Sequence, residues 1–297
     1  MQCKICGAKE SIFIGKPRID KKLTQINEKN YAIVQCKNCK FYYINPDIDL
    51  TQEEWSRLYK DNYFGNANIT DWQKKLHQSE RSSRINLIKK YSKINLDRFL
   101  DLGCGEGFVL KEALEHGFEP YGVDIADNLD DSLDRNEINF FNGNIFEAKY
   151  PDNFFSAIYM DSVLEHVDKP ISVLKELYRI LKPKGIVFLI VPNEDSLIND
   201  VKKLIYTLMF NKKKYGRIKP FVSPYHINGF NKISLEYAIK QSGFKIIELT
   251  QFGGNYTFWK AHKKFSKSYF RELILFPFGL LSIPLKKQIQ LQVIFEK

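Results

Sequence analysis

The stretch Phe99-Leu100-Asp101-Leu102-Gly103-Cys104-Gly105-Glu106-Gly107 decides how the rest of the chain is interpreted. Two apolar residues and an acid lead into three alternating glycines, and a run with helical character follows from Phe108 to Glu115. This order predicts a strand, a tight turn and a helix. Glycine lets a ligand lie against the backbone of such a turn, and it adopts dihedral angles that cost other residues free energy. The first turn of the helix then presents unpaired N–H groups to that ligand.

The spacing of the glycines distinguishes between classes of ligand. A dinucleotide site has the pattern G-x-G-x-x-G, whereas here the third glycine, Gly107, comes one residue early. The acid at the start of the loop, Asp101, suits a zwitterionic or cationic ligand better than a phosphate. The next predicted strand ends at Asp124, where a carboxylate can accept both hydroxyls of a ribose. Together these features indicate a nucleoside without a phosphate group.

At these residues the chain resembles the class I S-adenosylmethionine-dependent methyltransferases, whose first motif is similar to LDLGCGEG and whose second strand ends in an acid like Asp124. The resemblance continues in the expected order through SVLEHV (162–167), LKPKGIVFLIVPN (181–193) and SLEYAIKQSGFKIIEL (234–249). It implies an α/β fold with a Rossmann-like, seven-stranded, mostly parallel sheet whose last strand is antiparallel. Another α/β nucleotide-binding fold is the alternative.

The resemblance also implies which residues bind S-adenosylmethionine. The amino acid end of the cofactor is expected on Asp101, Gly103, Gly105 and Gly107, the ribose on Asp124, and the adenine on Asn144 with Ile145. The family often has an acid where this chain has Asn144. Its amide oxygen can still accept the adenine amino group.

Two histidines lie in or beside motifs that are expected to form the cleft. His166 follows Glu165 beyond the end of the fourth predicted strand (156–161), where ligands approach an open α/β sheet. His226 lies where similar enzymes place a histidine that faces the acceptor. Either imidazole could take a proton from an acceptor hydroxyl, because its pKa is near neutral. The alternative for each is a histidine that only caps or packs.

Two C-x-x-C pairs near the N-terminus, Cys3 with Cys6 and Cys36 with Cys39, predict a tetrahedral zinc site. Four thiolates leave no open position, so the zinc would be structural. It would hold together a ribbon that is too small to bury a sufficient core alone. A redox pair or independent cysteines are the alternative. We expect Cys104 to be a small side chain of the cofactor loop rather than a nucleophile.

The motifs and the resemblance together imply three units: a zinc ribbon at 1–45, a helical lid or linker at 46–95, and the methyltransferase domain at 96–297. Related methyltransferases have such a helical element over the bound cofactor, and core packing beneath the ribbon is the alternative. The domain carries insertions at about 194–231 and 253–288. Helices are also expected at 52–59, at 71–91 and, after Asp124, at the acidic stretch 127–136.

The composition limits the partners and the location. Lys and Arg exceed Asp and Glu by 45 to 35, which suits an anionic partner such as a nucleic acid, a nucleotide sugar or a membrane face. The N-terminus lacks the apolar core of a secretory signal, and the apolar run 273–285 is too short to span a bilayer. We therefore expect a cytoplasmic protein without a transmembrane segment. Cations beside that run make peripheral contact with the inner membrane face through 260–287 an alternative to core packing.

A cysteine ribbon followed by this core resembles methyltransferases of bacterial surface-polysaccharide and sugar-modification pathways. That resemblance implies a small-molecule or glycan acceptor: a nucleotide sugar, a polysaccharide or a lipid-linked saccharide. The alternative is an rRNA or tRNA methyltransferase that binds RNA through the zinc ribbon and the basic surface. Against it, Asp161-Ser162-Val163-Leu164 replaces the Asn-Pro-Pro-aromatic motif of amino-directed base methylases. A scaffold that binds the cofactor without turnover is a third possibility.

Overall fold

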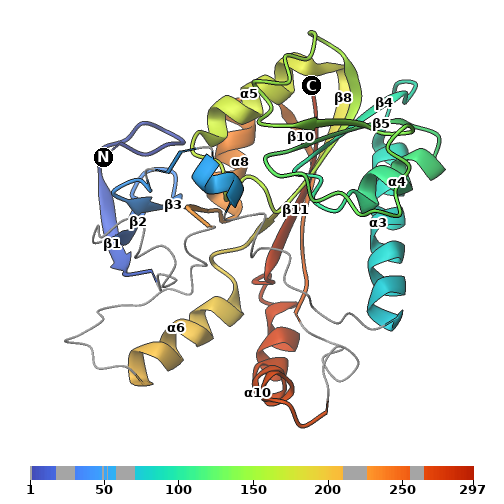
Figure 1. Cartoon of the computed structure of the whole chain (residues 1–297). Helices are drawn as coiled ribbons and strands as arrows, with labels where there is room; N and C mark the ends of the chain where they lie inside the picture. The colour runs from blue at the N-terminus through green and yellow to red at the C-terminus, as the bar shows by residue number, and fades with distance from the viewer. Residues whose placement is uncertain are drawn as a thin grey trace.

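A seven-stranded sheet forms the centre of the protein in the computed structural model, which describes residues 2–17, 31–48, 50–51, 53–57, 71–209, 226–254 and 264–297 (Figure 1). The strand order is β10-β11-β8-β7-β4-β5-β6. β4, β5, β6, β7 and β8 are parallel to one another, and β11 is antiparallel to β8 and β10. This confirms the expected α/β fold. The strands are β4 (Arg98–Leu102), β5 (Glu119–Asp124), β6 (Asn139–Asn142), β7 (Phe155–Asp161), β8 (Leu181–Pro192), β10 (Lys245–Phe252) and β11 (Gln290–Glu296).

Alternate residues of the central strands enter two different cores. In β8, the even-numbered residues from Ile186 to Ile190 pack with α3 and α4, whereas the odd-numbered residues from Val187 to Val191 pack with α5 and α8. Successive side chains of a strand point to opposite faces, so helices on both faces require an apolar strand throughout. The helices are α3 (Asp71–Tyr91), α4 (Phe108–Glu115), α5 (Pro170–Ile180) and α8 (Lys232–Gln241).

The N-terminal ribbon forms a second, four-stranded sheet in the order β1-β2-β3-β9. Its last strand, β9 (Asn228–Gly229), comes from the C-terminal half of the chain and pairs with Tyr42 and Tyr43. The ring of Phe41 lies 5.1 Å from that of Phe230, and buried residues of the ribbon join the core under α5 and α8. The ribbon is therefore continuous with the core of the large sheet. The other strands are β1 (Ser11–Gly15), β2 (Ala32–Cys36) and β3 (Tyr42–Asn45).

The expected helix at 127–136 is wrong, because these residues form turns. The side chains of Asp127, Asp130 and Asp134 each accept a hydrogen bond from the backbone N–H two residues ahead, at 3.4, 2.9 and 2.9 Å. Such local bonds offer the backbone an alternative to helical pairing. The helices expected at 71–91 and 108–115 have those bounds. Of the helix expected at 52–59, residues 53–57 are described and helical.

The two insertions contribute α6 (Leu197–Met209) and α10 (Lys267–Ser282), which pack against each other. Both helices extend from the edge of the sheet where β8 and β10 end (Figure 1). Residues 210–225 and 255–263 of the insertions lie outside the described residues.

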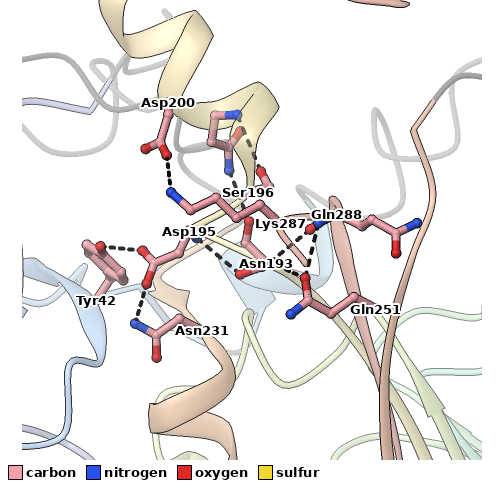
Figure 2. A network of polar contacts seen from close by, with 10 residues as sticks. Tyr42, Asn193, Asp195, Ser196, Asp200, Asn231, Gln251, Lys287 and Gln288 are labelled. Carbon is pink, nitrogen blue, oxygen red and sulfur yellow. Dashed lines mark hydrogen bonds and ion pairs between the residues drawn. The ribbon is translucent and has the colours of Figure 1, made fainter. Parts of the chain in front are cut away.

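A polar network holds the bases of these two helices on the sheet (Figure 2). The Asn193 side-chain amide donates to the backbone oxygen of Gln288 at 2.8 Å, and the Gln288 N–H donates to the side chain of Gln251 at 3.1 Å. Lys287 pairs with Asp200 of α6 at 3.0 Å. The network thus joins α6, β10 and the segment after α10.

Candidate functional site

A cavity of about 1660 Å³ opens at the carboxyl ends of β4, β5 and β7. The glycine loop, Asp124, the turn after β6 and the segment after β7 line it. Helix α3 and the residues Pro46, Asp47, Ile48, Leu50 and Trp55 also contribute to the lining. Open α/β sheets bind ligands at this edge, and the volume exceeds the usual range of about 300–1,000 Å³ for one small ligand. The cavity therefore has room for a cofactor and an acceptor together.

The glycine loop needs glycine for conformation and for packing. Gly103 and Gly107 both have φ of 77°, in the left-handed region that favours glycine. A Cβ on Gly103 would lie 2.3 Å from a methyl carbon of Val163, and one on Gly107 would lie 2.6 Å from a methyl carbon of Leu133. At these two positions the protein's own side chains already exclude a Cβ. From the sequence alone, we expect a ligand rather than a side chain in this role.

Asp124 is held at the cavity wall by backbone N–H groups. Gly105 donates to Oδ2 at 2.9 Å and Ala126 donates to Oδ1 at 3.0 Å. Burial raises the pKa of Asp124, while these hydrogen bonds oppose the shift. A carboxylate oxygen has two lone pairs, so each oxygen can still accept a ribose hydroxyl.

Asp101 lies at the end of β4, lines the cavity and is almost completely buried. Burial raises its pKa well above the usual range, and the nearby carboxylates of Asp161 and Asp124 raise it further. Three acids close to one cavity favour a ligand that carries positive charge.

Arg84 of α3 is a site residue that sequence analysis missed. Its guanidinium donates to Asp161 Oδ2 at 2.7 Å and to the Tyr159 hydroxyl at 2.9 Å, at the end of β7. This contact joins α3 to the end of β7 at the edge of the cavity. The sequence signal would have been a basic residue beside Ile85 and Ile88, the apolar positions of α3 that pack against the sheet.

Asn144 begins a tight turn after β6. Its side-chain oxygen accepts the N–H groups of Phe146 and Glu147 at 3.0 and 3.1 Å. The oxygen that we expected to receive the adenine amino group therefore already serves the turn. Contact with adenine would use the NH2 group of Asn144, which donates to ring nitrogens. Ile145 is buried and lines the cavity, as expected for an apolar contact with the base.

His166 and His226 lie together although 60 positions separate them in the chain. Their ring centroids are 4.8 Å apart and the rings meet edge to face at 83°. His166 lines the cavity, as does Ile227, which follows His226. Burial lowers the pKa of His226 to about 3, and His166 contributes to that shift. His226 is therefore a neutral imidazole near pH 7.

Glu165 is the third member of this cluster, and sequence analysis gave it no role. Its carboxyl is 1% exposed, and within the described residues neither oxygen has a hydrogen-bond partner. The distance from its Oε1 to His166 Nε2 is 3.8 Å. Burial raises the pKa of Glu165 well above the usual range. The ligand atoms of Glu165, His166 and His226 lie within 4.8 Å of one another, so this set can hold a proton or a divalent cation.

The segment that carries His226 also holds the turn that carries His166. The backbone N–H groups of Ile227 and Asn228 donate to the backbone oxygen of Glu165 at 3.1 and 3.0 Å. The Asn228 side chain donates to the Val167 oxygen at 2.6 Å. Because Asn228 also pairs with Tyr43, the short strand that follows His226 belongs to the ribbon sheet.

The four N-terminal cysteines come together as expected. Their sulfur atoms all lie within 4.8 Å of one another, with 3.5 Å between Cys3 and Cys39 and between Cys6 and Cys36. A tetrahedral ion with bonds of about 2.3 Å to sulfur needs separations of about 3.8 Å, so the cluster fits zinc.

Two equivalent turns position these sulfurs. Gly7 N–H donates to the Cys3 oxygen at 2.9 Å and Lys40 N–H donates to the Cys36 oxygen at 3.1 Å, with positive φ at Gly7 and Lys40. The hydrogen bond with the Cys39 thiol, together with backbone N–H groups, lowers the pKa of Cys3 to about 5, against the effect of burial. Cys104 lies apart in the glycine loop, where burial raises the pKa of its thiol.

Comparison with known sequences gives matches over this region. A family model described as a methyltransferase domain matches residues 67–249. An uncharacterized protein of Methanocaldococcus jannaschii is 32% identical over 183 residues, which cover 61% of this chain and 76% of that protein. A demethylmenaquinone methyltransferase of Oceanobacillus iheyensis is 28% identical over 131 residues, which cover 41% of this chain and 55% of that enzyme.

Solved structures share the fold. An S-adenosylmethionine-dependent methyltransferase from Archaeoglobus fulgidus superposes with a TM-score of 0.53 at 21% identity, covering 80% of this chain and all of that one. A phosphoethanolamine N-methyltransferase from Haemonchus contortus, in complex with S-adenosylmethionine, gives 0.52 at 16% identity, covering 97% of this chain and 68% of that one.

Proposed function

Because the chain belongs to the methyltransferase-domain family and is an S-adenosylmethionine-dependent methyltransferase, we propose that it methylates a hydroxyl of a saccharide or another small-molecule acceptor. The observation that carries this proposal is the cluster of Glu165, His166 and His226 beside the glycine loop. It puts a proton acceptor at a cavity with room for a second ligand. The demethylmenaquinone methyltransferase among the relatives is named for a small molecule, which supports this class of acceptor.

The cofactor side of the proposal uses the residues expected from the sequence. Asp101 and the N–H groups of the loop containing Gly103, Gly105 and Gly107 would bind the amino acid end, with the ammonium close to the acid-rich wall. Asp124 would accept the ribose hydroxyls, and Asn144 and Ile145 would contact the adenine. S-adenosylmethionine supplies an electrophilic methyl group on a positively charged sulfur.

Transfer to an acceptor hydroxyl requires a base for its proton, and the acceptor oxygen must lie in line with the methyl carbon and the sulfur. His166 takes the hydroxyl proton while the acceptor oxygen forms its bond to the methyl carbon and the carbon–sulfur bond breaks. His226, neutral in its buried position, orients the ring of His166 by edge-to-face contact. A positive charge on His166 would be stabilised by Glu165, because a cation 3.8 Å from the buried carboxyl lowers its pKa and favours the carboxylate.

The four-cysteine cluster would hold a structural zinc ion, through Cys3, Cys6, Cys36 and Cys39. That role needs reduced thiolates, which supports a reducing compartment such as the cytoplasm. Zinc at this position would stabilise β3 and, through β9, the segment that carries His226.

Transfer of label tests the proposal. The zinc-loaded protein is incubated with S-adenosylmethionine labelled in the methyl group and with separate pools of nucleotide sugars, lipid-linked saccharides and RNA. We expect label in a saccharide pool and a loss of that label in His166→Ala. Label in RNA alone, with binding that weakens steeply with salt, would replace this proposal with the RNA alternative.

A further inference from the structure

Helix α10 differs from an ordinary surface helix, which buries its apolar stripe, because most of its large apolar side chains are exposed. The side that faces the protein has four buried residues, Glu272, Leu275, Gly279 and Ser282, and only Leu275 is a large apolar residue. The opposite side carries large apolar residues that are each 44–62% exposed: Phe270, Leu273, Ile274, Leu280 and Leu281. The helix therefore presents its apolar stripe outward.

Close packing fixes this orientation. A Cβ on Gly279 would lie 2.5 Å from the backbone oxygen of Gly254, so only glycine lets α10 approach the end of β10 this closely. Glu272 accepts a hydrogen bond from Arg271 at 3.1 Å, and its charge also acts on the half-buried Lys202 of α6. Rotating α10 to bury the apolar stripe would expose this polar seam and drive a larger side chain into the Gly254 backbone.

Helix α6 extends the same kind of surface. Leu204 is 59% exposed and Leu208 is 75% exposed, on a helix that packs against α10. We call the exposed apolar residues of these two helices the α6/α10 face. Both helices extend from the carboxyl edge of the sheet (Figure 1), which is also the edge where the cofactor cavity opens. Large exposed apolar patches mark contact surfaces.

The charged residues around α10 are mostly cations, which favours an anionic partner. Between residues 264 and 288 the sequence has a single acid, Glu272, and it is buried. The same segment has five exposed cations: Lys264, Lys267, Arg271, Lys286 and Lys287. Arg271 and Lys287 are paired with acids, which leaves an excess of positive charge at both ends of the helix. An apolar stripe flanked by cations complements a bilayer that contains anionic lipids.

We propose that the α6/α10 face seats the protein on an anionic bilayer surface, with its apolar side chains among the headgroups and its cations beside the lipid phosphates. No described helix is both long enough and apolar enough to cross a bilayer, so the contact lies in the plane of the surface. The proposal goes beyond the methyl transfer proposed above, because it places the protein and its cavity at the surface of a bilayer. An acceptor attached to a lipid would then reach the cavity without leaving the bilayer.

Vesicle binding by the full zinc-loaded chain tests this inference. We measure co-sedimentation with vesicles of phosphatidylcholine alone and with phosphatidylglycerol added, for the wild type and three variants. Ile274→Asp/Leu281→Asp breaks the apolar stripe and Lys264→Glu/Lys267→Glu reverses two charges. Ile233→Asp changes a residue that is 59% exposed on α8, far from this face in sequence, and is the matched control. S-adenosylmethionine affinity, measured by calorimetry, verifies that each variant is folded.

We expect the wild type and Ile233→Asp to bind the anionic vesicles equally, and each double variant to bind at least about tenfold more weakly. Failure of the wild type to bind, or undiminished binding by the double variants, would overturn the inference. So would a wild-type dimer that becomes monomeric in Ile274→Asp/Leu281→Asp, without vesicle binding by either protein. None of these measurements uses methyl transfer, so the proposed reaction can fail independently.

Discussion

The cavity wall around Asp124 and the wall around His226 are built from very different lengths of chain. Residues 98–124 supply a strand, the glycine loop, a helix and a second strand in one segment, and Asp124 is held by Gly105 and Ala126. On the other wall, His226 meets His166 across 60 positions, and the strand after it completes a sheet that begins in the N-terminal ribbon. One wall depends on local geometry and the other on distant contacts. The two walls should therefore lose their function separately, and substitutions at each wall test this difference.

Loss of the proposed zinc should have the largest effect on stability and turnover. This effect should arise at the histidine wall, by which we mean the wall around His166 and His226. Structural zinc contributes about 10–16 kcal/mol of binding free energy in small domains. In Cys36→Ser/Cys39→Ser we expect no zinc by elemental analysis, a lower melting temperature and loss of turnover, because β3 no longer supports β9. S-adenosylmethionine affinity should change by less than about threefold if the fold persists. Cys104→Ala should keep its zinc. Full turnover without zinc would show that the walls are not coupled in this way.

Removal of the proposed base, His166, should have the second largest effect. For His166→Ala we expect turnover to fall by about 10²–10⁴, the usual contribution of general acid–base catalysis, with an unchanged affinity for the cofactor. His226→Ala should lower kcat less, because that ring orients His166. Steady-state kinetics and calorimetry separate the two effects. Unchanged turnover in both variants would leave the histidine pair with a structural role.

Asp124→Ala should affect the cofactor wall alone. Loss of hydrogen bonds to a charged carboxylate costs about 2–3 kcal/mol, so we expect S-adenosylmethionine to bind about 30- to 150-fold more weakly. Asp124→Asn should fall between Ala and wild type, since its oxygen still accepts a hydrogen bond. Calorimetry gives the affinities, and zinc content should equal that of wild type. Wild-type affinity in Asp124→Ala would contradict the ribose assignment.

Lowering the pH should reduce the free energy of unfolding through His226, and this effect should be smaller than those of the substitutions above. The pKa of His226 is lowered to about 3 in the folded protein, whereas an unfolded histidine titrates near about 6.5. The unfolded chain therefore binds the extra proton as the pH falls below the unfolded value, and stability is lost by about 1.4 kcal/mol per pH unit. Urea unfolding at pH 7, 6 and 5 should show a loss of about 2 kcal/mol by pH 5 that His226→Gln lacks.

The exposed His77 on α3 provides the control for that comparison. His77→Gln should retain the full pH dependence of the wild type. Protonation of the zinc thiolates in acid acts on all three proteins alike, so the difference between wild type and His226→Gln isolates His226. Parallel pH profiles for these two proteins would contradict the buried neutral imidazole.

The parts that sequence predicted well are those set by neighbouring residues. The strand before Gly103, the helix at 108–115 and the strand that ends at Asp124 follow from apolar runs and glycine spacing, and the structure gives them those bounds. The helix expected at 127–136 failed because three aspartates bond to the backbone two residues ahead, a competition that charge patterning does not reveal. The same applies to the Asn144 oxygen, which serves its own turn.

Spacing within single segments was enough to predict the strands and glycine loop around Asp124, the order of the blocks and the two pairs of cysteines. Only the folded chain shows that Glu165 lies with the two histidines, that Arg84 of α3 pairs with Asp161, and that β9 joins the ribbon to the histidine wall. Only the folded chain shows, too, that most of the large apolar side chains of α10 are exposed. These features arise from contacts between distant segments, and no local pattern records which face of a helix the rest of the chain will cover.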